Sequence, residues 1–184
     1  MVFEYYGFHG SDFENFEGIR SENFKESENE DEWLGYGVYF FIEGISDPEE
    51  NAAEWARNQA FHNGVYTYER YVVCKAKIRC SKVLDATNIE GLKAYNTLRN
   101  KIIQKHDEYF QANRKLRTDD RVMWNLVAQM MSLDAVVHNL YIKDRVQRIK
   151  RISSNVPNTT VLCVKVRDCI VDETIEAVSD GGVK

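Results

Sequence analysis

The stretch VYTYERYVVCKAKIRC, residues 65–80, constrains the fold more than any other part of the chain. It is long and rich in β-branched and aromatic residues, which favour extended backbone, so it must form a strand or one arm of a hairpin. Two shorter stretches have the same character. EYYGFHGS ends in a turn at Gly10 and Ser11, and GVYFF (37–41) has the composition of a buried strand. A sheet therefore organises this chain.

Helical signals lie between and after these strands. SDPEENAAEWARNQAF (46–61) offers a capping residue, a proline in the first turn, early acids and a later arginine. From Asn88 to about Leu133 the apolar residues recur at helical spacing, with a second helix expected from Asp119 to Ser132. Strands return at 134–142 and 159–166. This order predicts an α+β fold with a mostly antiparallel sheet, in a single domain over 1–184.

Size and composition narrow the class of protein. The 184 residues suffice for one domain with a proper core, and 43% of them are hydrophobic. No apolar run is long enough to span a membrane and the N-terminus lacks a signal-peptide pattern, so we expect a cytoplasmic protein without a membrane partner. The net charge of −5 argues against indiscriminate nucleic-acid binding. The acidic run SENEDE (27–32) and the basic run KDRVQRIKRI (143–152) are expected to be solvated surface.

Standard catalytic and nucleotide-binding motifs are absent from the sequence. It contains no Walker A, GxGxxG, GxSxG or HExxH pattern. The cysteines have apolar neighbours and no zinc-ligand spacing, so we expect packed, reduced thiols at Cys74, Cys80, Cys163 and Cys169. The sequence thus predicts no metal, no disulfide and no cysteine nucleophile.

Three short segments remain that together suit a ligand: FHGS (8–11), WLGYGVYFF (33–41) and ENAAEWA (50–56). Gly35 and Gly37 let the backbone approach a ligand closely. Tyr39 lies in an otherwise apolar strand, where a phenol needs a partner, and Trp55 follows in the next helix. Two aromatic rings and a glycine backbone can sandwich a flat heteroaromatic carboxamide and pair with its amide.

In order and spacing these segments resemble the NAD-binding half of the poly(ADP-ribose) polymerases and diphtheria-toxin-like ADP-ribosyltransferases. Members of that superfamily carry HGS or HGT on the first strand and GxGxYF on the second, followed by a helix with small residues and an aromatic. The resemblance covers residues 5–60, while the helical block at 88–133 looks like an insertion. It implies the ADP-ribosyltransferase fold, a split and mostly antiparallel sheet around an NAD cleft.

The resemblance also implies roles for individual residues. His9 would bind the nicotinamide-side ribose, the Gly10 backbone would pair with the carboxamide, and Tyr39 would stack on the nicotinamide ring. Ala52 stands where the family has a serine that touches the amide, a contact that Asn51 would have to supply instead. The donor-binding set implied in this way is His9, Gly10, Ser11, Gly37, Tyr39, Ala52 and Trp55, with Trp33 on the loop that covers the donor.

The catalytic glutamate of the family has no evident counterpart. In the family it opens a late strand, which aligns here with NTTVLCVKV (158–166), where the first strand positions are Thr159 and Thr160. Either Thr160 takes the third catalytic place, beside His9 and Tyr39, or a carboxylate approaches from elsewhere. The carboxylates considered for that place are Glu69, Asp134 and Glu173. We favour Thr160, and we therefore expect no polymer formation, because elongation in the family depends on the glutamate.

These features predict an NAD-dependent mono-ADP-ribosyltransferase that releases nicotinamide and modifies a macromolecular acceptor. NAD would be its co-substrate, no metal would take part, and the resemblance suggests a toxin or defence effector. The alternative is a catalytically inactive module of the same fold that binds NAD, or binds a protein or nucleic acid through 143–152. RNA 2′-phosphotransferases share the fold but carry an arginine directly before the histidine, where this chain has Phe8. The sequence leaves the acceptor open.

Overall fold

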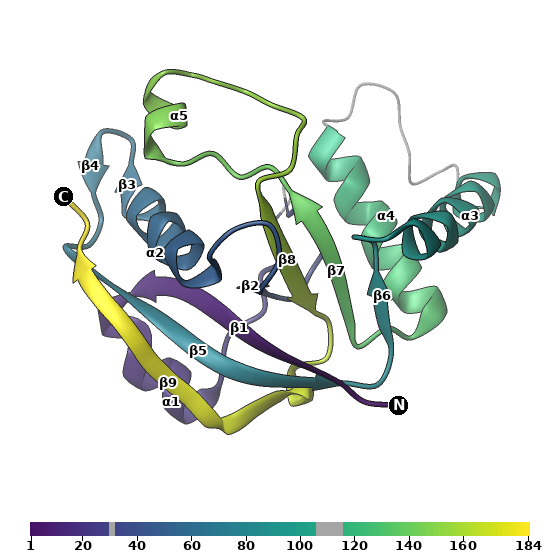
Figure 1. Cartoon of the computed structure of the whole chain (residues 1–184), viewed down its shortest axis with the longest axis horizontal. Coiled ribbons are helices and arrows are strands. Elements are labelled where there is room, and N and C mark those ends of the chain that lie inside the picture. Colours follow the sequence, from purple (N-terminus) through teal and green to yellow (C-terminus); the bar gives the residue numbers. More distant parts are fainter. Residues whose placement is uncertain (30–31, 106–115) are drawn as a thin grey trace.

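The computed structural model describes residues 1–29, 32–105 and 116–184, with side chains from 118 onward in the last range. Within these ranges seven strands form one sheet in the order β6–β7–β8–β2–β1–β5–β9, and β3 and β4 form a separate hairpin (Figure 1). Neighbouring strands of the sheet are antiparallel except β6 and β7, which are parallel. The strands are β1 (Phe3–Asp12), β2 (Val38–Phe41), β3 (Phe61–His62), β4 (Val65–Tyr66), β5 (Arg70–Cys80), β6 (Val83–Asp85), β7 (Ala135–Leu140), β8 (Thr159–Val164) and β9 (Ile170–Gly182).

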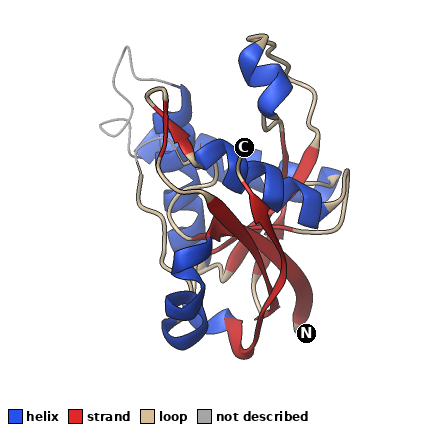
Figure 2. Cartoon of the chain, turned by 90° about the vertical axis from the view of Figure 1, so that its left-hand side faces the viewer, coloured by secondary structure: helices blue, strands red, loops and turns tan. Residues whose placement is uncertain are grey.

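Helices lie on both faces of the sheet. One face packs against α2 (Pro48–Gln59) and against the pair α3 (Ile89–Lys105) and α4 (Leu116–Met131), in one shared core. The other face packs against η1 (Phe13–Asn15) and α1 (Phe16–Glu22), which is drawn faint behind β5 and β9 in Figure 1. A 3-10 turn, η3 (Arg167–Cys169), precedes β9. The short helix α5 (Arg145–Ile149) lies in the long loop between β7 and β8, residues 141–158. We call this loop the excursion; it extends above the rest of the chain (Figure 2).

The predicted mixture of helices with a mostly antiparallel sheet is confirmed. Within the helical block expected over 88–133 the structure has α3 and α4, while residues 106–115 of that block lie outside the described residues. The strands expected at 134–142 and 159–166 are β7 and β8. The strand expected over 65–80 is interrupted. The N–H of Thr67 donates to the carbonyl of Ala60 at the end of α2 (2.7 Å), which folds 61–66 into the β3–β4 hairpin before β5 begins at Arg70.

Helix α2 lies very close to β1. Its N-terminus is set by Asp47, whose carboxylate accepts two backbone N–H groups of the first turn at 2.9 Å, and by Pro48 in that turn. The buried residues of this helix are all alanines, Ala52, Ala53 and Ala56, of which Ala52 and Ala56 are fully buried. At Gly10 an added Cβ would collide with the carbonyl oxygen of Ala52. Glycine at this position therefore lets the helix backbone rest directly on the strand.

Strands β1 and β2 meet at one position and then separate. β1 pairs with β5 along its whole length, from Phe3 opposite Cys80 onward. Between β1 and β2, both fully described, the register has the single pair Phe8 opposite Phe41. β2 instead pairs along its whole length with β8 on its other side. The sheet consequently opens between β1 and β2 from His9 onward.

Replacing Gly10 by alanine should destabilise the protein by about 2–3 kcal/mol, because the new methyl group must push α2 away from β1. Urea unfolding followed by circular dichroism measures the loss. Gly18→Ala is the matched control, since Gly18 lies in α1 with no atom within 4 Å of an added Cβ. That control should be neutral or stabilising by up to about 1 kcal/mol. Equal effects of the two substitutions would contradict the close seating of α2.

Candidate functional site

A cavity of about 530 Å³ lies where β1 and β2 separate. Its volume falls in the range of natural small-ligand sites. Its walls come from β1, the loop between α1 and β2, β2 itself, α2, β8 and the excursion that carries α5. We call it the β1–β2 cleft, and its lining includes His9, Gly10, Lys25, Glu32, Trp33, Gly37, Tyr39, Trp55 and Arg148.

His9 stands at the point where β1 leaves β2. Its Nδ1 lies 2.8 Å from the carbonyl oxygen of Tyr39. A carbonyl can only accept, so Nδ1 carries the proton and Nε2 of the neutral ring is an acceptor. The ring meets Phe24 and Phe40 edge-on, at 5.0 and 5.9 Å between centroids. Burial lowers the pKa of His9, and the hydrogen bond to the Tyr39 carbonyl opposes that effect, so the cleft is lined by a neutral imidazole.

Tyr39 lines the cleft with its ring while its hydroxyl is engaged elsewhere. The hydroxyl donates to the carbonyl of Gly35 (2.6 Å) and accepts from the N–H of Leu34 (2.9 Å). Burial raises the pKa of this phenol far above its ordinary value. The Tyr39 hydroxyl is therefore committed to this loop and is not available to a ligand as a proton donor.

The loop that leads into β2 is held by side chains from distant parts of the chain. Lys165, directly after β8, donates through Nζ to the carbonyls of Leu34 (2.5 Å) and Tyr36 (2.6 Å). Asn125 of α4 accepts the N–H of Tyr36 through Oδ1 at 2.8 Å. Between them Gly35 takes a left-handed conformation, with φ of 81°. These hydrogen bonds of Lys165 and Asn125, which we call the clamp, fix the backbone between Trp33 and Tyr39.

Trp33 and Trp55 form a further aromatic wall of the cleft. Their ring centroids are 5.7 Å apart and the planes meet at 63°, an edge-to-face contact. Trp33 belongs to the loop between α1 and β2, and Trp55 belongs to α2. Together with Tyr39 they bound the cleft by aromatic side chains from three separate segments.

The cleft has one carboxylate and two cations among its described lining residues. The carboxylate is Glu32, whose Oε1 accepts from the Ser27 hydroxyl and from Nδ2 of Asn29 (3.2 Å). The cations are Lys25 and Arg148, the latter on α5. An acid and a pair of cations in one cavity suit a ligand that has both an electron-poor centre and an anionic group.

Some of the predicted donor-binding residues lie in the cleft and others do not. Its lining contains His9, Gly10, Gly37, Tyr39, Trp55 and Trp33. Ser11 and Ala52 lie outside the lining. The Ser11 hydroxyl accepts from the Asn15 side chain at 3.2 Å, and Ala52, a residue of α2, is fully buried where the helix meets Gly10. Asn51, expected to replace a missing serine, instead donates to Ser46 (2.7 Å) and Thr159 (3.0 Å). Its amide joins the start of α2 to β8.

Thr160, expected in the third catalytic place, lies outside the lining of the cleft. It is 5% exposed, donates to Oδ1 of Asn139 on β7 (2.8 Å) and accepts the N–H of Ile45 (3.2 Å). Its hydroxyl thus links β7, β8 and the loop before α2.

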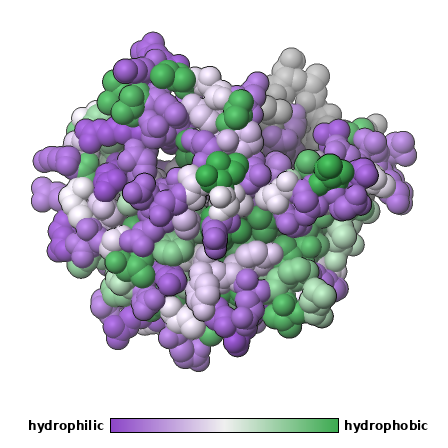
Figure 3. Space-filling model, in the orientation of Figure 1, coloured by the Kyte–Doolittle hydropathy of each residue, from purple (hydrophilic) through white to green (hydrophobic). Residues whose placement is uncertain are grey.

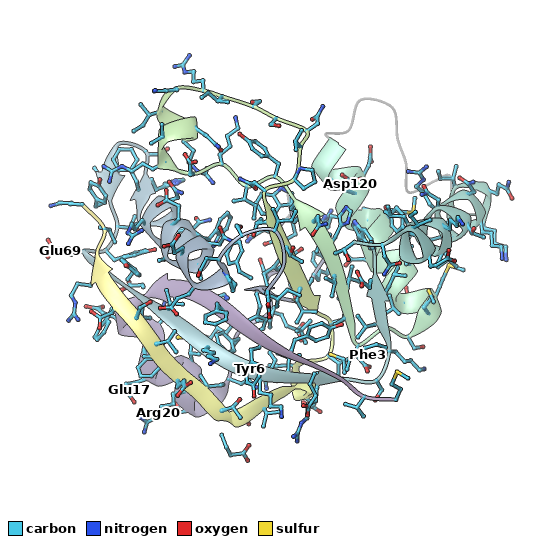
Figure 4. All side chains as sticks on the ribbon, viewed as in Figure 1. Phe3, Tyr6, Glu17, Arg20, Glu69 and Asp120 are labelled. Atoms are coloured by element: carbon cyan, nitrogen blue, oxygen red, sulfur yellow. The ribbon has the colours of Figure 1, made fainter. Side chains whose placement is uncertain are left out.

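The three alternative carboxylates lie outside the lining as well. Glu69 and Glu173 are exposed, and Figure 4 shows Glu69 at the outer edge of the sheet, pointing away from it. Asp134 is committed to the backbone N–H groups of Ser81 and Lys82, at 2.7 and 2.9 Å. Among the described residues, the carboxylate that does line the cleft is Glu32, which the sequence reasoning missed. The signal was its position directly before Trp33, in the acidic stretch SENEDEWLG that the resemblance places on the loop covering the donor.

The four cysteines are free thiols. Burial raises the pKa of each, that of Cys74 to about 12, so none is prepared as a nucleophile. In the described part of the chain no three His, Cys, Asp or Glu side chains gather as a metal site requires. None of the helices within the described ranges is long and apolar enough to cross a membrane.

Comparisons with known protein families, with curated protein sequences and with solved structures found no match to this chain. The function of the candidate site is therefore inferred from its own geometry and chemistry.

His9 should titrate below the ordinary histidine pKa of 6.5, with the proton of the neutral form on Nδ1. Long-range ¹⁵N NMR of the imidazole measures both, and His9→Gln assigns the signal. Because the unfolded chain then takes up this proton at a higher pH than the folded one, the stability due to His9 is complete above pH 6.5 and is lost as pH falls toward the folded pKa. A raised pKa, or a proton on Nε2, would contradict this assignment.

Lys165→Met should lower the free energy of unfolding by about 1–3 kcal/mol, because two loop carbonyls lose a charged donor. Chemical denaturation measures the change. Lys93→Met is the control: Lys93 pairs with Glu90 on the surface of α3 at 3.5 Å, and both side chains are largely exposed. Its loss should cost no more than about 0.5 kcal/mol. A Lys165 variant as stable as this control would rule out the clamp.

Proposed function

We propose that the protein is an NAD-dependent mono-ADP-ribosyltransferase whose donor binds in the β1–β2 cleft. The observation that carries the proposal is the convergence on one cavity of a neutral imidazole, a wall of aromatic rings and a single described carboxylate. Part of the same proposal is that the sheet, which opens between β1 and β2, is an ADP-ribosyltransferase fold. The resemblance of FHGS, WLGYGVYFF and ENAAEWA to that superfamily supports it independently.

In this proposal the nicotinamide ring stacks on Tyr39, with Trp33 and Trp55 closing the aromatic wall around it. The unprotonated Nε2 of His9 accepts a hydrogen bond from a hydroxyl of the adjoining ribose. The cations Lys25 and Arg148 bind the diphosphate.

The proposed reaction breaks the bond between ribose C1′ and the pyridinium nitrogen, and the electron pair leaves with neutral nicotinamide. Positive charge then spreads over C1′ and the ring oxygen, where a nearby carboxylate stabilises it. We assign this role to Glu32, in place of Thr160. Glu32 also accepts the proton from the acceptor atom as that atom bonds to C1′, which balances the transfer.

A catalytically inactive NAD-binding module is the second candidate. The position of the described acid favours it: Glu32 comes from a loop, while the opening of β8 presents Thr159 and Thr160, both buried. Such a module would keep the aromatic wall and His9 without the transfer step. NAD binding alone does not distinguish the two candidates, whereas release of nicotinamide does.

Glu32→Gln should slow transfer of ADP-ribose from radiolabelled NAD to lysate acceptors by about 100-fold or more, while NAD affinity stays nearly unchanged. His9→Ala should weaken NAD binding, because its ribose contact is lost. Glu28→Gln is the matched control, since Glu28 lies on the same loop, is exposed and is not part of the cleft lining.

Each outcome of this experiment separates the candidates. NAD binding without nicotinamide release in the unaltered protein would establish the inactive module. Full activity of Glu32→Gln would remove Glu32 from the mechanism. Absence of NAD binding, measured by calorimetry, would overturn both candidates.

A further inference from the structure

The excursion between β7 and β8 has a second surface beside the cleft. Four aliphatic side chains on 145–156 point into solvent, with exposed fractions of 57% at Val146, 72% at Ile149, 46% at Ile152 and 73% at Val156. At the upper left of Figure 3, apolar residues lie among hydrophilic ones in the region of α5. Isolated exposed apolar residues are ordinary, whereas four of them within one short segment make it a candidate interaction site.

This excursion is held by internal hydrogen bonds although its apolar side chains are not buried. Asp144 and Gln147 form a capping box at the start of α5, and Gln147 also accepts from the Tyr141 hydroxyl at 2.9 Å. The side chain of Asn158 bonds both backbone groups of Ile142, at 2.9 and 2.8 Å. The polar groups thus fix the shape of the excursion internally. Its aliphatic side chains are presented in a fixed arrangement, which lowers the entropy cost of binding a partner.

The surface continues onto the β3–β4 hairpin. The Arg145 N–H donates to Oε1 of Glu54 on α2 (2.6 Å), and its guanidinium donates to the Tyr66 hydroxyl (3.3 Å). Tyr66 in turn packs edge-on against Phe61, at 5.1 Å between centroids, and Phe61 and Val65 are 53% and 61% exposed. We call the exposed side chains of 145–156 and of this hairpin the α5 surface.

The α5 surface is cationic as well as apolar. Lys143, Arg145, Lys150 and Arg151 lie on it or at its edge. Among the residues that the structure describes, no carboxylate forms an ion pair with any of these four. The one acid of the excursion, Asp144, is committed to capping α5. Anionic groups on a partner would therefore meet cations that no described carboxylate holds in an ion pair.

We propose that the α5 surface is the docking site of an acidic protein segment that also carries apolar side chains. The aliphatic side chains need an apolar complement, and the four cations need an anionic one. Single-stranded nucleic acid fits less well, because the four exposed aliphatic side chains of 145–156 offer bases no ring to stack on, and the aromatic rings of the surface, Phe61 and Tyr66, are confined to the hairpin. A membrane surface fits less well too, because a five-residue helix lacks the extended apolar face of an interfacial helix.

The location of this surface connects it to the cleft. Arg148 lies on the same helix and lines the cleft, while its neighbours Ile149 and Lys150 are exposed on the α5 surface. A docked segment would thus lie at the mouth of the cleft. One step rests on the proposed function: that the docked protein is the ADP-ribose acceptor. The docking itself does not depend on NAD.

Fluorescence anisotropy, without NAD, measures binding of a labelled random copolymer of glutamate and tyrosine. The comparison probes are polyglutamate, a single-stranded oligothymidine, and vesicles of phosphatidylcholine and phosphatidylserine. The copolymer should bind at least about tenfold more tightly than each of them. Ile149→Ser should weaken copolymer binding about tenfold and leave polyglutamate binding unchanged. The double substitution Lys150→Gln with Arg151→Gln should weaken both, and added salt should do the same.

Ile103→Ser, at a 45% exposed position on α3, and Lys93→Gln are the matched controls and should change nothing. Preferential binding of oligothymidine or of vesicles overturns the proposal, as does equal binding of the copolymer and polyglutamate. So does copolymer binding that Ile149→Ser leaves intact. Because the measurement contains no NAD, a protein that binds the copolymer but not NAD would refute the proposed function alone. A protein that transfers ADP-ribose but ignores the copolymer would refute the docking site alone.

Discussion

The hydrogen bond between the imidazole of His9 and the carbonyl of Tyr39 determines how the sheet opens. In a continuous ladder that carbonyl would receive a backbone N–H from the neighbouring strand. Here β1 pairs with β2 only at Phe8 and Phe41, and a side chain supplies the donor one residue later. The carbonyl of Tyr39 thus keeps a hydrogen-bond partner at the point where the strands move apart. The same bond fixes the tautomer of His9 and leaves Nε2 as an acceptor.

The walls of the cleft depend on parts of the chain that are far away in sequence. Tyr39 forms a wall with its ring and holds the preceding loop with its hydroxyl. Lys165 and Asn125 hold the same loop from β8 and α4. The helical block at 88–133 is therefore more than an appendage, because α4 contributes a hydrogen bond to the loop that positions Trp33 and Tyr39. A change at Asn125 would therefore reach the cleft through that loop.

Charge is distributed in a way that connects the two proposals. In the cleft a described carboxylate, Glu32, and two cations, Lys25 and Arg148, suit a donor with a developing positive centre and a diphosphate. Outside the cleft, on the same helix as Arg148, cations accompany exposed aliphatic side chains. A protein with a net charge of −5 thus keeps a local cationic surface where a partner would approach the proposed reaction centre. The helix α5 would then contribute to the β1–β2 cleft through Arg148 and to the α5 surface through Ile149.

The sequence by itself determined the mixed fold, the helical block at 88–133 and the approximate places of the strands, because periodicity and β-branched composition act over neighbouring residues. It also brought His9, Tyr39 and Trp55 together as candidates for one site, from their order in three short segments. Tertiary structure alone decided which other residues join them. Ala52 is covered by its contact with Gly10, Thr160 is buried among β7, β8 and a loop, and Glu32 reaches the cleft from an acidic run. These outcomes depend on helix packing and strand divergence, contacts between residues far apart in the chain that no local pattern encodes.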